Sequence, residues 1–379
     1  MKQAFAGVPI WIQLFRNSEG PFLFPSRTVR KNPELKPRFP RQVSGFAVHV
    51  PKLVRPVKSR NASTIHAASK GIYAEAWQFL KPRHGRVRDL QGLYESAEVD
   101  AAFLYQMVGQ LLRLLRHAWY DQAKPGACEE LWGAREIPSP ALDSFPPYGF
   151  TLSWKARILS SLEELHSRAR RLRPADWPKE SKLISVWVAN GPNTGGRASH
   201  PCRVCLSQIH GDLNKNNILF WVEENQAFLI DFVMYQAAAH TLQDFGRLEA
   251  EVKFALMETE ENLKSPVADY EPSGLPEWID AERHLAVTTW SPTTIIPPVA
   301  SGSHGARSRA LDVVKLVRHH AFEVRSNALN DGDIEGFRTE YGAALLYPTL
   351  RAIAFDTVSL PKRIFAVHSA AQLIDFLHH

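Results

Sequence analysis

The sequence predicts a mixed α+β protein in which a small β-rich N-terminal part precedes a mainly helical C-terminal part. Strand-like apolar runs occupy residues 9–15, 21–24 and 45–50. After residue 100, apolar side chains recur every three or four positions over long stretches, which is typical of amphipathic helices. We therefore expect residues 1–100 to hold a proline-rich leader and a reduced β lobe, and residues 101–379 to form a helical lobe.

The first sixty residues carry a strong positive charge. They contain 12 Lys and Arg against two acidic residues, together with eight prolines. A basic arm that contacts nucleic acid is one interpretation of this block. We favour a solvated leader, because the prolines are spread through it and no basic helix is present. Nucleic acid is therefore not an expected partner.

The helical part divides into segments with clear apolar stripes. Asp100 is placed to cap the first of them. Helices are expected at residues 66–80, 101–119, 154–172, 310–329, 334–356 and 361–378, with a further helical pattern from Leu242 to Ala255. Residues 124–147 read as a loop. Residues 258–310 contain six prolines and are expected to be irregular, as a lid, a binding insertion or a disordered segment.

The central stretch, residues 209–232, combines polar side chains with a hairpin pattern. Asp212 and Asn217 lie five positions apart, and Asp231 follows Asp212 by nineteen. Two short apolar runs between Asn217 and Asp231 predict a hairpin, which would bring these two residues together. An amide oxygen and a carboxylate suit Mg²⁺. Asp212 would be free to orient or deprotonate an attacking hydroxyl.

This stretch also carries a resemblance to a known family. The pattern His210-Gly211-Asp212-x-x-x-x-Asn217, followed by an apolar run that ends in Asp231-Phe232, resembles the catalytic segment of the aminoglycoside phosphotransferase and choline kinase branch of the protein-kinase-like fold. Protein kinases carry Arg at the position of Gly211. More loosely, residues 242–249 and the C-terminal helices resemble phosphotransferase-like domains of bacterial signalling and conflict systems.

The resemblance implies a two-lobed, protein-kinase-like fold that binds ATP and Mg²⁺. By this resemblance Asp212 would be the catalytic base, Asn217 and Asp231 the metal ligands, and His210 a structural anchor of the loop. A phosphate-contacting lysine is also implied, with a helix glutamate as its partner. Lys58 with Glu75 is the preferred pair and Lys52 the alternative; two exposed charges remain an equally open interpretation. No Gly-rich phosphate-covering loop is evident.

Two further patterns are interpreted as structural. Asp244-Phe245-Gly246 spells a kinase metal-binding tripeptide, but it lies thirty-two residues after Asp212 and inside a helical pattern. We expect Asp244 to be a structural carboxylate that bonds backbone amides of the loop or of its own helix. The set His200, Cys202, Cys205 and His210 could hold zinc, but its spacing is shorter than in common zinc fingers, and Cys205 is better explained as a small buried residue.

Two classes of function follow. The first is an ATP- and Mg²⁺-dependent phosphotransferase that acts on a hydroxyl of a small molecule. The alternative is a catalytically weak kinase-like module that binds a nucleotide or a protein partner, and the missing glycine loop favours it. Three cysteines predict a reducing, cytoplasmic compartment. The absence of an apolar run of 18 residues predicts no membrane span.

Overall fold

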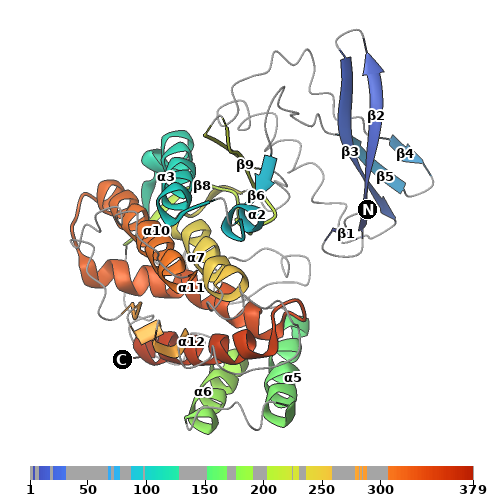
Figure 1. Cartoon of the computed structure of the whole chain (residues 1–379). Coiled ribbons are helices and arrows are strands. Elements are labelled where there is room, and N and C mark those ends of the chain that lie inside the picture. Colours follow the sequence, from blue (N-terminus) through green and yellow to red (C-terminus); the bar gives the residue numbers. More distant parts are fainter. Residues whose placement is uncertain are drawn as a thin grey trace.

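The computed structural model (Figure 1) describes the N-terminal strands by their backbone, and most of the chain after residue 86 with its side chains. The described ranges beyond those strands are 87–96, 99–127, 152–168, 176–190, 203–223, 225–229, 236–257, 278–280, 282–283, 285–287 and 306–378. Within them the protein is mixed α+β and mostly helical, with small antiparallel sheets, as the sequence predicted.

The N-terminal strands form a five-stranded antiparallel sheet in the order β1-β2-β3-β5-β4. Their bounds are Gln3–Ala4, Val8–Asn17, Gly20–Arg30, Ala67–Ser69 and Ile72–Ala76 for β1, β2, β3, β4 and β5. The two strands expected at residues 9–15 and 21–24 are confirmed as β2 and β3. The third expected strand, Lys52 and Lys58 lie outside the described residues.

The helix expected at residues 66–80 is a wrong prediction. This stretch forms β4 and β5, and Glu75 lies in β5 opposite Arg27 of β3. The helical pattern was local, whereas the pairing with β3 spans more than forty residues and satisfies the backbone groups through a sheet. Glu75 is therefore not the helix glutamate that the Lys58–Glu75 pair required.

The remaining helix predictions agree with the structure to within a few residues. Asp100 caps α3 as expected, accepting a hydrogen bond from Phe103 N at 2.7 Å. Sequence reasoning missed α6. The helices are α2 (Leu90–Tyr94), α3 (Ala101–Ala118), α5 (Leu152–Arg168), α6 (Trp177–Asn190), α7 (Leu242–Glu251), α10 (Ala306–Leu329), α11 (Ile334–Ala354) and α12 (Leu360–His378). A π-helical turn, η5 (Val252–Leu256), continues α7, and η1 (Tyr120–Gln122) follows α3.

Two small sheets carry the polar loop of the sequence analysis. One has the order β10-β9-β6, and the other β11-β8-β7. Their strands are β6 (Val87–Asp89), β7 (Lys124–Ala127), β8 (Arg203–Ile209), β9 (Ile218–Trp221), β10 (Gln226–Leu229) and β11 (Gln236–His240). The predicted hairpin is confirmed as β9–β10, which pair antiparallel with Leu229 opposite Ile218. The loop expected to begin at Lys124 begins instead with a strand, β7.

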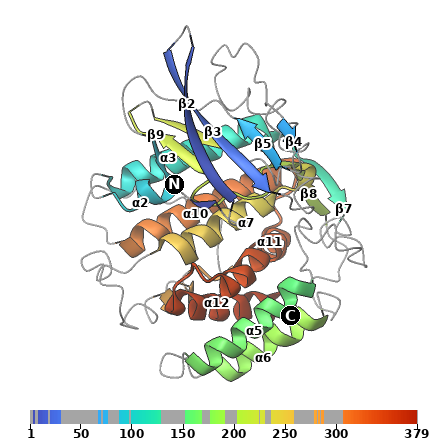
Figure 2. The same cartoon turned by 90° about the vertical axis from the view of Figure 1, so that its right-hand side faces the viewer.

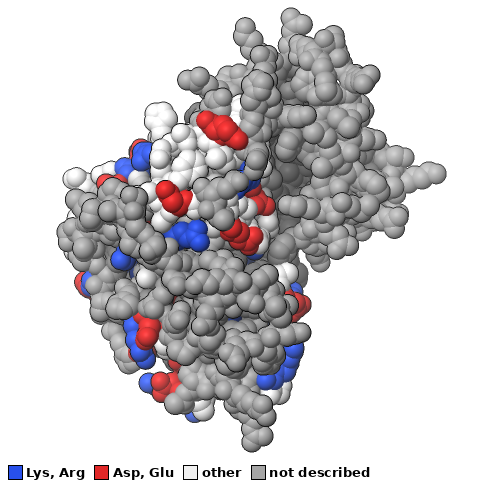
Figure 3. All heavy atoms as spheres, in the orientation of Figure 1, with Lys and Arg blue, Asp and Glu red and all other residues white. Residues whose placement is uncertain are grey.

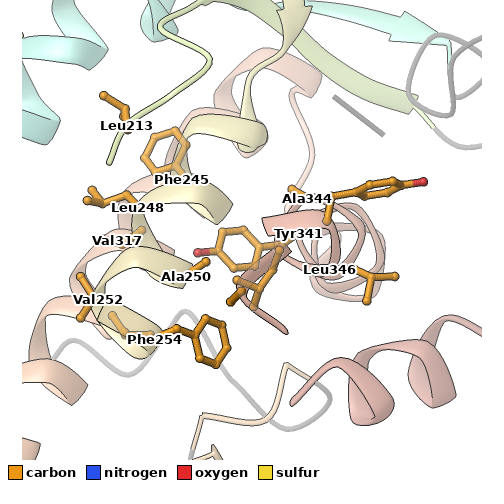
Figure 4. Packing of buried hydrophobic residues seen from close by; sticks show 14 of the residues in the cluster. Leu213, Phe245, Leu248, Ala250, Val252, Phe254, Val317, Tyr341, Ala344 and Leu346 are labelled. Atoms are coloured by element: carbon orange, nitrogen blue, oxygen red, sulfur yellow. The ribbon is translucent and has the colours of Figure 1, made fainter. Parts of the chain in front are cut away.

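The core of the helical part is organised around α7. This helix packs against α11 and α10, while α11 also packs against α12 and α5. Figure 4 shows Leu213 of the polar loop beside Phe245 of α7, with Tyr341 between α7 and α11. A Cβ atom on Gly246 would lie 2.6 Å from Ala344 O, so this glycine permits backbone contact between the two helices. Figure 2 shows α5 and α6 as a pair beside α12.

Two buried ion pairs lie inside this core. Arg318 is 1% exposed and donates from Nε and Nη2 to the two carboxylate oxygens of Glu249, at 2.7 and 2.6 Å. Tyr341 OH donates to Glu249 Oε2 at 2.7 Å. Lys253 Nζ lies 2.5 Å from Glu282 Oε2 and 4.0 Å from Glu249 Oε1. The contacts of Glu249 tie α7 to α10 and α11, and those of Lys253 tie η5 to Glu282.

One face of the described part shows no dominant charge. On the face in Figure 3, acidic and basic side chains are interspersed over the described residues, and neither sign gathers into a broad patch there. No helix in the described part of the chain combines the length and the apolar character that a membrane crossing requires.

Candidate active site

The Asp244 side chain anchors the loop between β8 and β9, residues 210–217, by accepting hydrogen bonds from its backbone. This carboxylate, at the start of α7, accepts hydrogen bonds from His210 N at 2.7 Å and Gly211 N at 2.8 Å. Tyr120 OH also donates to it, at 2.7 Å. Burial raises the pKa of Asp244, against the opposing influence of His210 and of these hydrogen bonds. The backbone bonds that we expected Asp244 to make with the loop are therefore present.

The backbone of the loop turns sharply at two points. Gly211 has a φ of 80°, in the left-handed region that glycine adopts without strain. Asn214 then forms a local turn, in which Asn214 N donates to Asp212 O at 2.8 Å and Asn216 N donates to Asn214 Oδ1 at 2.9 Å. Leu213, between the two turns, is 1% exposed. The buried leucine pins the loop to the core, while the polar residues on either side face outward.

The carboxylate of Asp212 is oriented by three donors. Oδ2 accepts from Asn214 Nδ2 at 2.9 Å and from Asn217 Nδ2 at 3.3 Å. Oδ1 accepts from Arg247 Nε at 3.1 Å. The side chain is still 34% exposed. A carboxylate offers about four acceptor positions, so at least one remains for an external hydroxyl.

Arg247 is a site residue to which sequence reasoning assigned no role. It lies on α7 and bridges Asp212 to Glu251, with Nη1 donating to Glu251 Oε2 at 2.8 Å. Although burial opposes its charge, the carboxylates of Glu251 and Asp212 raise the pKa of Arg247. Its spacing was a usable signal, because a residue three positions after Asp244 lies on the same side of the helix as the loop anchor.

Asn217 occupies the entrance to the β9–β10 hairpin. Its side chain is buried, and Nδ2 donates to Asp212 O at 2.9 Å as well as to Asp212 Oδ2. Within the described residues no hydrogen bond engages its Oδ1. This oxygen fits one ligand of a hard cation such as Mg²⁺. Asp231, the second expected ligand, lies outside the described residues, as does any cleft between Asp231 and the N-terminal lysines.

His210 is buried at the start of the loop. Its Nδ1 accepts a hydrogen bond from Asp212 N at 3.3 Å, so the imidazole contacts the backbone on which the carboxylate is mounted. This contact is of the kind expected for a loop anchor.

Cys205, one of the two cysteines of the alternative zinc set, belongs to a different cluster. His200 and Cys202 lie outside the described residues, while Cys205 lies with His240 and Glu340, their ligand atoms within 4.8 Å of one another. Glu340 Oε1 accepts from Cys205 N at 3.1 Å and contacts His240 Nε2 at 2.7 Å, and Oε2 accepts from Arg325 Nε at 2.8 Å. Burial opposes ionisation of Glu340, but His240 and Arg325 outweigh it and lower its pKa. The guanidinium already balances the carboxylate, so we interpret this cluster as a structural network.

Comparison with known families finds a match to part of the chain. A family model described as "Ternary complex associated domain 9" matches residues 197–351. A comparison with curated proteins gave no match. The matched segment contains the loop at residues 210–217, all of α7 and α11 as far as Arg351, whereas Tyr120 lies outside it.

Proposed function

We propose that the chain is an ATP- and Mg²⁺-dependent phosphotransferase of the protein-kinase-like fold that acts on a hydroxyl of a small molecule. The observation that carries the proposal is the pairing of Asp212 with Asn217. One loop holds a partly exposed carboxylate beside an amide whose oxygen accepts no hydrogen bond from the described residues, at the start of a two-stranded hairpin. This is the arrangement that phosphoryl transfer requires of a base and a metal ligand.

The residues of the loop have separable roles in this proposal. The acceptor hydroxyl donates its hydrogen bond to Asp212, which orients the oxygen toward the γ-phosphorus and receives its proton as the new P–O bond forms and ADP leaves. Asn214 and Arg247 hold the carboxylate in place. Asn217, with Asp231, would hold Mg²⁺, which supplies charge neutralisation to the phosphates when it is bound.

A second candidate is a kinase-like binding module. The ion pair with Arg247 already balances the charge of the Asp212 carboxylate. The matching family model is described by association in a ternary complex, which favours a protein partner. In this reading the loop binds a nucleotide or a protein surface without turnover.

Calorimetry of ATP binding with and without Mg²⁺ tests the site. Asn217→Ala should weaken Mg²⁺-dependent binding at least tenfold, about 1.4 kcal/mol. Asn216→Ala is the matched control, because Asn216 is the exposed neighbour on the same loop. Asp212→Asn should retain binding.

Transfer activity then separates the two candidates. With an accepted substrate, Asp212→Asn should lower the turnover number by about 10²–10⁴-fold. A folded wild-type protein that binds no Mg²⁺·ATP would refute both the phosphotransferase and the nucleotide-binding module. Binding without any transfer across an acceptor panel would favour the binding module.

A further inference from the structure

Arg351 lies near the end of α11, a helix that packs on α7. It lies seven residues after Ala344, two helical turns away and on the same face. Ala344 is the residue whose carbonyl meets Gly246 of α7. Arg351 therefore shares the α7-facing side of α11, and Arg247 follows Gly246 directly. The charges of Arg247 and Asp212 are both close enough to influence Arg351.

The guanidinium of Arg351 has no acceptor in the described part of the protein. Its Nε is buried and makes no hydrogen bond. Its central carbon lies 5.5 Å from the ring centroid of Trp154 on α5, which supports the cation without offering an acceptor oxygen. Burial first, and then the positive charge of Arg247, lower the pKa of Arg351 to about 10, so it stays charged at neutral pH. A buried donor left without an acceptor is costly and points to a missing ligand.

A neighbouring arginine provides the contrast. Arg157 also lies over Trp154, at 5.4 Å, but its Nε donates to Ala354 O at 3.1 Å and its Nη2 lies 3.4 Å from Asp356. Both arginines use the same aromatic ring, and the structure gives an acceptor only to Arg157. Packing on Trp154 therefore does not explain why Arg351 lacks one.

Arg351 belongs to a different layer of the structure from the hairpin that follows Asn217. The β9–β10 hairpin, which begins next to Asn217, packs chiefly against β6 and α3. Arg351 belongs instead to α11, which packs against α7, α12 and α5. In the proposed reaction we assign this helical layer to the hydroxyl substrate and the hairpin to the metal-bound phosphates.

We propose that the acceptor carries an anionic group, a carboxylate or a phosphate monoester, which Arg351 binds while Asp212 holds the hydroxyl. This inference rests on the function proposed above and specifies its substrate class. A guanidinium has five N–H donors in a planar fork that matches either oxyanion. Unlike an aminoglycoside or choline, such a substrate carries negatively charged oxygen atoms that can accept the hydrogen bond that the buried Nε of Arg351 lacks.

The direct test observes the Nε–H resonance of Arg351 by nitrogen-15 NMR, assigned by its loss in Arg351→Lys. The probes are four small alcohols of similar size: glycerate and glycerol 3-phosphate as anions, glycerol as the neutral compound and 3-aminopropane-1,2-diol as the cation. Each is titrated with and without Mg²⁺ and a non-hydrolysable ATP analogue. The two anions should shift the Arg351 signal and leave that of Arg157 in place. No shift up to the solubility limit, an equal shift with all four alcohols, or a shift caused by the nucleotide alone would overturn the proposal.

Kinetics give the second test. Arg351→Gln should raise the KM for an anionic acceptor at least tenfold, as expected for a lost charged hydrogen bond, and leave Mg²⁺·ATP binding unchanged. Arg157→Gln is the control and should change the KM little. Efficient turnover of a neutral or cationic acceptor would refute the substrate class while leaving the phosphotransferase intact. Failure of Mg²⁺·ATP binding would refute the phosphotransferase, and the NMR titration would still report whether Arg351 binds an anion.

Discussion

Asp244→Asn is the substitution that tests how the loop at residues 210–217 is held. In the structure, Oδ2 of Asp244 accepts from both His210 N and Tyr120 OH at 2.7 Å, and Oδ1 accepts from Gly211 N at 2.8 Å. Asparagine has a single acceptor oxygen. If that oxygen accepts from Gly211 N, the NH₂ group of the asparagine faces the other two donors, His210 N and Tyr120 OH. The tyrosine hydroxyl can rotate and accept from the NH₂ group, but the backbone N–H of His210 cannot.

The expected loss of stability in Asp244→Asn follows from these hydrogen bonds. One hydrogen bond to a charged acceptor is lost and one buried N–H is left without a partner, which together cost about 2–4 kcal/mol of unfolding free energy. The substitution also removes a buried charge whose desolvation is reflected in the raised pKa of Asp244. This offsets part of the loss, so a net decrease of about 2 kcal/mol is expected. Tyr120→Phe removes one bond and should cost about 1 kcal/mol.

Urea unfolding at neutral pH, followed by tryptophan fluorescence, measures both variants. Calorimetry with Mg²⁺·ATP on the folded proteins reports the loop itself. Asp244→Asn should be the less stable variant and the one that weakens nucleotide binding more. Equal stability of the two variants, or wild-type stability of Asp244→Asn, would show that Asp244 does not carry the loop.

Three further predictions concern buried charges. Arg318→Met should lower the free energy of unfolding by about 3–5 kcal/mol, because it leaves the carboxylate of Glu249 buried without the Arg318 guanidinium. In a denaturant titration, the double variant with Glu249→Met should recover most of this loss. No recovery would contradict the pairing. Burial and the charge of Arg116 lower the pKa of His320 to about 4. The folded state therefore favours the neutral imidazole. Its contribution to the free energy of unfolding, up to about 3 kcal/mol, is complete above pH 6.5 and disappears as the pH falls to about 4. His320→Gln should reduce the pH dependence of the free energy of unfolding between these values, and an unchanged pH dependence would refute the assignment. Arg351→Leu should raise the free energy of unfolding by about 1 kcal/mol, because it removes an unsatisfied buried donor; a lower melting temperature would argue that the arginine has a structural partner.

The parts of the fold that could be predicted were those with strong local patterns. The C-terminal helices have regular apolar stripes, and the β9–β10 hairpin has two apolar runs around a polar turn, so both followed from periodicity. The helix prediction for residues 66–80 was wrong because the pairing of β5 with β3 overrides the local helical pattern of the sequence. Helix α6 was missed although the sequence carried signals for it: Asp176 precedes it, Pro178 lies in its first turn, and Trp177 and Ile184 are buried two turns apart.

The candidate site also has a part that could be predicted from the sequence and a part that could not. The order and spacing of Asp212 and Asn217 could be read from the sequence, and the structure places these residues within hydrogen-bonding distance of each other. The contributions of Arg247 and Arg351 depend on the packing of α7 against the loop and against α11. Arg351 is 139 positions from Asp212 in the sequence, and no short pattern links them. Such contacts are fixed only when the helices pack.

Helix α7 contacts the loop on one side and the ionic core on the other. Asp244 and Arg247 hold the loop, while Glu249 and Lys253, on α7 and its π-helical extension, are enclosed with their partners in the interior. The acceptor of the loop amides of His210 and Gly211 is therefore mounted on a helix that is packed into the interior. We expect these amides to belong to the same cooperative unfolding unit as the core, so that the loop acts as a fixed platform.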